Sequence, residues 1–134
     1  MESVQTQTNE IDGVSHPTVL SYFETLNTGE FDATSELFAI DGVMQPPFEK
    51  PITGRDAIAD YLHREAIGIT AQPSQGTYQT IETGEVEFEI VGRVQTPVFS
   101  VNVTWRMILN ADDEVSFIRI KLNASPKELM NLRR

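Results

Sequence analysis

The spacing of apolar residues changes near residue 75, and this change limits most strongly what the chain can fold into. Before it, apolar side chains recur every three or four residues, as on one face of an amphipathic helix. After it they alternate with polar ones, as in 85–91 (EVEFEIV) and 99–109 (FSVNVTWRMIL). Helices followed by strands predict an α+β domain, with helices packed on one face of an antiparallel sheet.

The expected elements follow from this spacing and from local start and stop signals. Helices are expected over 17–27, 31–39 and 54–68, and strands over 43–45, from about 75, 85–91, 99–109 and 115–122. Ser125, Pro126 and Glu128 predict the N-cap, first turn and capping box of a final helix. Residues 1–14 are polar and aperiodic, which predicts a flexible arm before one domain of residues 15–134.

Composition excludes several classes of function. The net charge of −10 disfavours binding to nucleic acid and electrostatic binding to anionic lipid. The chain has no Cys and two distant His residues, so disulfides, a Cys nucleophile and a metal site are not expected. It has neither an apolar run of transmembrane length nor a signal peptide, which favours a cytoplasmic location.

Trp105 is the only tryptophan and stands in the middle of the apolar strand 99–109. Such an indole either fills the core or lines a cavity and offers its N–H to a ligand. Ile108, Val115 and Phe117 are expected on the opposite face of the sheet. Either the N-terminal arm or a second copy covers that face, or these are scattered surface hydrophobes.

Five segments in order, SYFETLNTGEFDATSELF, GVMQPPFEKPITGRDAIADYLHREA, GRVQTPVF, NVTWR and LNASPKELMNLRR, cover nearly all of residues 15–134. Together they resemble the C-terminal domain of the orange carotenoid protein family, within the nuclear-transport-factor-2-like superfamily. The resemblance implies a cone-shaped fold, with a curved antiparallel sheet, helices on its concave face and a C-terminal helix. It also implies a free-standing cyanobacterial carotenoid carrier without enzymatic activity.

In that family a ring carbonyl of a ketocarotenoid, of canthaxanthin or echinenone type, is held by a Tyr hydroxyl and a Trp indole. By resemblance these donors are Tyr22 and Trp105. A carbonyl oxygen has two lone pairs, so one O–H and one N–H satisfy it in a dry cavity. The inward faces of the expected elements supply the rest of the wall: Phe23, Leu26, Leu37, Met44, Phe48, Ile58, Leu62, Val101, Val103, Met107, Ile118 and Ile120.

Size and resemblance together bear on partners. A chain of this length has a radius of gyration of about 14 Å, too short to enclose a whole carotenoid. A homodimer sharing one carotenoid is therefore expected. The resemblance further implies helical carotenoid proteins as pigment donors or acceptors, transient membrane contact during pigment uptake, and photoprotection or quenching of singlet oxygen. Expected partner contacts are Glu65, Val98, which replaces a family aromatic, and Phe117.

Two alternatives remain open at this point. The fold also serves isomerases and dehydratases, but Gln45 stands where such an enzyme would have its general-base Asp, and an amide cannot accept a proton. Asp41, Glu49 and His63 are the remaining candidates, each more typical of a surface position. A dimerisation module without ligand predicts a cavity plugged by Met44, Met107 or Phe99.

Overall fold

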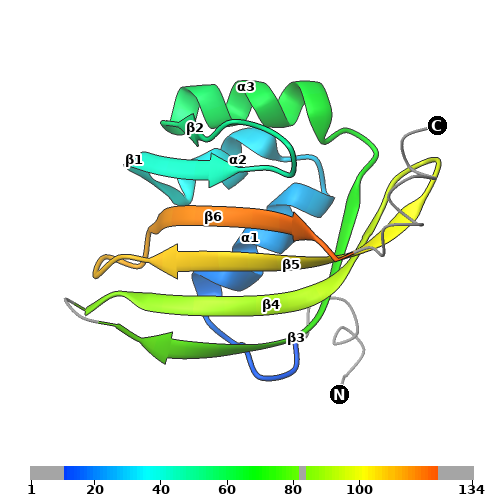
Figure 1. Cartoon of the computed structure of the whole chain (residues 1–134). Helices are drawn as coiled ribbons and strands as arrows, with labels where there is room; N and C mark the ends of the chain where they lie inside the picture. The colour runs from blue at the N-terminus through cyan, green and yellow to red at the C-terminus, as the bar shows by residue number, and fades with distance from the viewer. Residues whose placement is uncertain (1–10, 82–83, 124–134) are drawn as a thin grey trace, which may run out of the picture.

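The computed structural model describes residues 11–81 and 84–123. In chain order the elements are α1 (Pro17–Asn27), α2 (Phe31–Glu36), β1 (Phe38–Gln45), β2 (Ile52–Thr53), α3 (Arg55–Glu65), β3 (Thr70–Thr80), β4 (Val86–Gln95), β5 (Ser100–Leu109) and β6 (Val115–Leu122). The helices lie on one side of a curved sheet, with α1 behind its centre and α3 beyond β1 and β2 (Figure 1). The α+β architecture predicted from the change in periodicity is confirmed.

The six strands form one sheet in the order β2-β1-β6-β5-β4-β3. Four neighbouring pairs are antiparallel, but β1 and β6 run parallel. The sheet is therefore mixed, which corrects the expectation of a purely antiparallel one. A hairpin reverses the chain, whereas β1 and β6 are joined through five other elements that leave their relative direction free.

Helix α1 begins where the sequence signals place it. The Nδ1 atom of His16 accepts a hydrogen bond from the Thr18 N–H at 3.1 Å, and Pro17 occupies the first turn. The stripe Val19, Phe23 and Leu26 is buried, as its spacing predicts. These side chains pack the helix onto the concave face of the sheet.

The boundary between α2 and β1 corrects the sequence analysis. The helix expected over 31–39 ends at Glu36, and the strand expected over 43–45 already begins at Phe38. Phe38 pairs with Val115 and Val43 with Phe117, so the register shifts between the two pairs. At this bulge, a Cβ on Gly42 would lie 2.7 Å from the carbonyl oxygen of Val115. A strand bent in this way loses the period of two that would have identified it.

A second irregularity changes the face to which Val115 belongs. Ile108 pairs with Phe117, but Leu109 pairs with Val115, so Ser116 is the extra residue of a bulge. Val115 is fully buried in the core, and the expectation that it lies on the outer face is wrong. Phe117 and Ile108 remain on that face, both half-buried.

Residues 11–14, here called the N-terminal strap, run along the free edge of β3. The Asp12 N–H donates to the Ser74 carbonyl at 3.0 Å, and the Gly76 N–H donates to the Asp12 carbonyl at 2.9 Å. Ile11 and Val14 are each 5% exposed and join the core. This end of the expected arm is thus packed against the sheet, while the domain boundary at residue 15 stays a prediction.

At the opposite edge of the sheet, β2 is only two residues long. The final helix expected from Ser125 lies outside the described residues, as do residues 1–10 of the arm. None of the helices within 11–81 and 84–123 has both the length and the hydropathy needed to cross a membrane.

Candidate ligand-binding site

A cavity of about 730 Å³ lies between α1, α3 and the concave face of the sheet. Its inner wall includes Tyr22, Met44, Val103 and Trp105, all at most 2% exposed. Its rim includes Phe48, at 86% exposed, together with Glu65 and Phe99. The wall is mainly apolar, with a few polar groups that can orient a ligand, as is typical of sites for small organic molecules.

Tyr22 reaches this cavity from the middle of α1. It lies one position off the stripe of Val19 and Phe23, so the periodicity of the helix alone would place it at the edge of the buried face. Instead its side chain is 1% exposed and lines the cavity. Burial raises the pKa of the Tyr22 hydroxyl well above its ordinary value, and the nearby Tyr61 adds to the shift. The hydroxyl therefore stays protonated at neutral pH and is available as a donor.

Trp105 lines the same cavity from β5. Val101 and Val103 share its face of the strand and also line the cavity. This answers the question raised by the sequence, because the indole faces a cavity rather than solid core. Within the described residues, neither the Trp105 indole N–H nor the Tyr22 hydroxyl has a hydrogen-bond partner.

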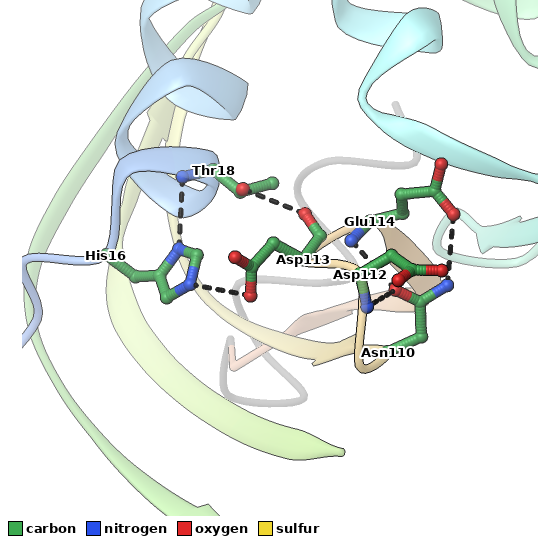
Figure 2. Close-up of polar contacts among 6 residues, drawn as sticks. All are labelled: His16, Thr18, Asn110, Asp112, Asp113 and Glu114. Atoms are coloured by element: carbon green, nitrogen blue, oxygen red, sulfur yellow. Dashed lines mark hydrogen bonds and ion pairs between the residues drawn. The ribbon is translucent and has the colours of Figure 1, made fainter. Parts of the chain in front are cut away.

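Both ends of α1 are tied to the sheet, which fixes where Tyr22 lies. At the first end, His16 Nε2 lies 3.3 Å from Asp113 Oδ1, and the Thr18 hydroxyl donates to the Asp113 carbonyl at 2.9 Å (Figure 2). At the last end, the Asn27 side chain accepts from the Ala71 N–H at 2.7 Å and donates to the Ala71 carbonyl at 2.9 Å. The helix cannot slide along the sheet without breaking one of these sets.

Asp113 is held in place by the turn between β5 and β6. The Asn110 Oδ1 atom accepts from the backbone N–H groups of Asp112 and Glu114, both at 2.9 Å (Figure 2). Asp113 itself has a positive φ of 63°, which Asp tolerates better than most residues. The turn that follows β5, the strand of Trp105, thus also anchors α1, the helix of Tyr22.

Most of the residues predicted for the site meet at the cavity. Those in its wall are Tyr22, Leu26, Met44, Phe48, Leu62, Val101, Val103, Trp105 and Ile120. The other predicted wall residues pack in or against the core and do not line the cavity: Phe23, Leu37, Ile58, Met107 and Ile118. These residues also point inward, but they lie where the helices pack directly on the sheet. The inward direction of a side chain therefore does not show whether it lines the cavity or fills the core. That any of these side chains binds a ligand stays a prediction.

Several lining residues were missed. They are Pro46, Pro47, Tyr61, Ala66, Ile69, Ala71, Val94, Thr96, Phe99 and Leu122. Val94 continues the inward alternation of β4, so extending the expected strand 85–91 by a few residues would have found it. Leu122 lies inside the expected strand 115–122 and continues the inward alternation of Ile118 and Ile120, but it was not counted among the wall residues. Most of the others lie in loops or at the ends of elements, where no periodicity marks them.

The three expected partner contacts lie apart from one another. Glu65 is on the cavity rim, Val98 is 83% exposed at the tip of the turn joining β4 and β5, and Phe117 is on the outer face. Near Glu65, the pKa of Tyr61 is raised by burial and by the carboxylates of Glu49 and Glu65. The guanidinium of Arg64, which lies 3.7 Å from the Glu65 carboxylate, lowers the pKa of Tyr61 and offsets part of this shift.

The residues considered for catalysis do not line the cavity. Asp41 and Glu49 are exposed, and Gln45 lies on the outer side of β1, paired with Arg119. His63 is also exposed, and its Nε2 atom lies 3.0 Å from Asp32. The plug expected of a ligand-free module is not formed either, since Met44 and Phe99 stand in the wall of an open cavity and Met107 lies outside it.

Comparison with known proteins gives consistent matches. Residues 14–119 match the nuclear transport factor 2 (NTF2) domain family. The orange carotenoid-binding proteins of Limnospira maxima and Synechocystis sp. (strain ATCC 27184 / PCC 6803 / Kazusa) are 41% and 39% identical to the chain over 127 and 128 residues. These matches cover 92% of this chain but only 40% of each relative, so the chain spans less than half of their length.

The solved structures agree with the sequence matches. The Orange Carotenoid Protein of Anabaena (Nostoc) sp. PCC 7120 binding canthaxanthin has a TM-score of 0.85 at 37% identity, over 95% of this chain and 42% of that one. The epoxide hydrolase/cyclase-like enzyme SalBIII has a TM-score of 0.61 at 18% identity, over 79% of this chain and 88% of that one. The second likeness shows a shared fold alone.

Proposed function

This chain belongs to the nuclear transport factor 2 (NTF2) domain family and is a homologue of the C-terminal domain of orange carotenoid proteins, and we propose that it binds and carries a carotenoid without enzymatic activity. The pigment is a ketocarotenoid of the canthaxanthin or echinenone type. One of its rings enters the cavity, and its carbonyl oxygen accepts hydrogen bonds from Tyr22 and Trp105.

One observation carries this proposal. Two buried proton donors, on different elements, line one apolar cavity and have no other hydrogen-bond partner in the described part of the chain. An unpaired buried polar group costs about 1–3 kcal/mol, so a ligand oxygen that satisfies both donors is favoured there. The apolar wall supplies most of the affinity through burial of the ring and polyene.

The rest of the pigment requires a second protein. The cavity of about 730 Å³ is open at its rim, where Phe48 and Phe99 line it, so the far half of a rod-shaped carotenoid extends out of the subunit. A homodimer with one pigment between two rims buries both rings equivalently. Helical carotenoid proteins act as donors or acceptors of the pigment, and transient contact with a membrane serves its uptake.

The biological role proposed is photoprotection in a cyanobacterial cytoplasm. A carrier of this kind delivers pigment for quenching of singlet oxygen or quenches it directly. The similarity to orange carotenoid-binding proteins supports this role.

The test compares two pigments that differ in the carbonyl alone. Purified protein is titrated with canthaxanthin and with β-carotene, its hydrocarbon counterpart, and Kd is measured from the visible spectrum. The wild-type protein is expected to prefer canthaxanthin. Tyr22→Phe or Trp105→Phe is expected to weaken canthaxanthin binding roughly fivefold each, the equivalent of one hydrogen bond, and to leave β-carotene unchanged.

Tyr78→Phe is the matched control, because it removes the same hydroxyl from a tyrosine that is 63% exposed and outside the cavity wall. It is expected to bind both pigments as the wild type does. Equal affinity of the wild type for the two pigments, or no binding of either, refutes the proposed function.

A further inference from the structure

We infer that Phe23 is a positioning residue that sets the separation and orientation of the two carbonyl donors without touching the ligand. The inference rests on the proposed function and deepens it. The sequence places Phe23 in the wall of the cavity, but the structure places it behind that wall. It is 3% exposed and absent from the lining, although the residue before it and a residue across from it both line the cavity.

The geometry of three aromatic rings carries this inference. The centroid of the Phe23 ring lies 5.1 Å from that of Tyr22, with an angle of 85° between the planes. It lies 4.9 Å from the Trp105 centroid, with an angle of 81°. Both are edge-to-face contacts, the arrangement that aromatic rings prefer and that fixes orientation as well as distance. Phe23 is therefore in direct contact with both donors.

Helical geometry explains why Tyr22 and Phe23, although neighbours in the sequence, face different surroundings. Consecutive side chains on an α-helix diverge by about 100°, so Tyr22 faces the cavity while Phe23 points down onto the sheet. There it meets Trp105, which comes from β5. The side chain of Phe23 thus connects the helix that carries one donor with the strand that carries the other.

Loss of this ring is expected to affect hydrogen bonding more than burial. Hydrogen bonds weaken steeply as the angle at the donor closes, whereas burial of apolar surface has no directional dependence. If Phe23 is shortened, Trp105 and Tyr22 can each tilt into the space that is left. A ketone would then lose affinity, while a hydrocarbon of the same shape would not.

The test measures the ratio of Kd for β-carotene to Kd for canthaxanthin in full-length Phe23→Leu and Phe88→Leu. Phe88 is the matched control, because it is also 3% exposed on the inner face of the sheet, but it makes its ring contacts with His16 and Tyr78. We expect Phe23→Leu to lower the ratio about fivefold, as for loss of one hydrogen bond, and Phe88→Leu to leave it unchanged.

A second measurement needs no pigment. Trp105 is the only tryptophan, so the near-ultraviolet circular dichroism of its indole reports how firmly this ring is held. Phe23→Leu is expected to weaken the indole bands, and Phe88→Leu to preserve them. Phe23→Met repeats both measurements with an unbranched side chain that adapts to gaps in a core, in case Leu lowers the thermal unfolding midpoint more at position 23 than at 88.

The outcomes separate this inference from the proposed function. If the wild type prefers canthaxanthin and both Phe23 variants keep that preference and the indole bands, Phe23 has no positioning role, while the proposed function stands. An equal fall in the ratio for Phe23→Leu and Phe88→Leu also overturns the inference, because it indicates general loosening of the core. A wild type without preference refutes the proposed function itself.

Discussion

At the scale of single residues, the site depends on two neighbours in the sequence, Tyr22 and Phe23, that face different surroundings. The hydroxyl of Tyr22 is enclosed by the cavity wall, whereas Phe23 is enclosed by the core. The apolar stripe identified Phe23 as buried but gave no reason for Tyr22 to be buried. That burial comes from packing against residues distant in sequence, such as Phe38. Resemblance to a family, rather than periodicity, pointed to Tyr22.

The enclosure of Tyr22 predicts a specific alkaline instability. Burial raises the pKa of its hydroxyl in the folded state above the value of about 10 for an unfolded chain. The protonated form is thus favoured by folding, so this contribution to stability is complete below about pH 10 and declines as the pH rises further. We expect the free energy of unfolding in urea to fall more steeply between pH 10 and 11 in the wild type than in Tyr22→Phe.

The variant retains Tyr61, whose pKa is also raised, so some decline remains in both proteins. If the free energies of unfolding of the two proteins fall in parallel above about pH 10, Tyr22 ionises as a solvated phenol does. Below that pH the two curves are expected to run parallel.

At the scale of elements, the sequence predicts best those parts that follow a single period. The strands β4, β5 and β6 alternate without interruption over most of their length, and α1 carries both a start and a stop signal. Bulges are missed, because one extra residue shifts every later side chain to the other face, as happened at Val115. The loop residues of the cavity, such as Pro46 and Thr96, were missed because no periodicity indicates which side of a loop faces inward.

The N-terminal strap gives a prediction at this scale. Gly13 has a φ of +91°, and a Cβ at this position would lie 2.4 Å from the Gly76 carbonyl oxygen. Gly13→Ala must therefore displace backbone, and we expect it to lower the free energy of unfolding by roughly 2–3 kcal/mol. Gly29→Ala is the control, because Gly29 has a similar φ of +79° with nothing within 4 Å.

Gly29→Ala is expected to cost about 1 kcal/mol, the penalty of the left-handed backbone alone. Chemical denaturation of the two variants measures the difference. Equal losses would mean that the strap is not held against β3 in solution.

At the scale of the whole molecule, the cavity rim and its surroundings carry exposed apolar side chains. Phe48 is 86% exposed on the rim, and Val98 is 83% exposed between two rim residues, Thr96 and Phe99. In the proposed homodimer, the shared pigment would bring two such surfaces together and remove them from water. The proposed dimer therefore depends on the pigment at its centre.

This arrangement predicts the composition of the loaded protein. Light scattering and absorption are expected to give two chains and one pigment per particle. Val98→Glu is expected to shift loaded protein towards monomer, because it puts a charge into the contact. Ile40→Glu, at a residue that is 78% exposed but outside the cavity wall, is expected to leave the mass unchanged. Loaded wild-type protein with the mass of one chain would contradict the dimer.

The way residues 11–14 lie along β3 also has a consequence for solubility. A long edge strand exposes peptide groups on which foreign chains can add, and growth of amyloid begins in this manner. Here the backbone of Asp12 is hydrogen-bonded to the Ser74 carbonyl and the Gly76 N–H in the middle of that edge. Pro73, beside them, has no N–H that another strand could bind. The opposite border ends in a strand of two residues, which is too short to template another. We therefore expect a chain that lacks residues 1–13 to form fibrils under conditions in which the intact chain stays in solution.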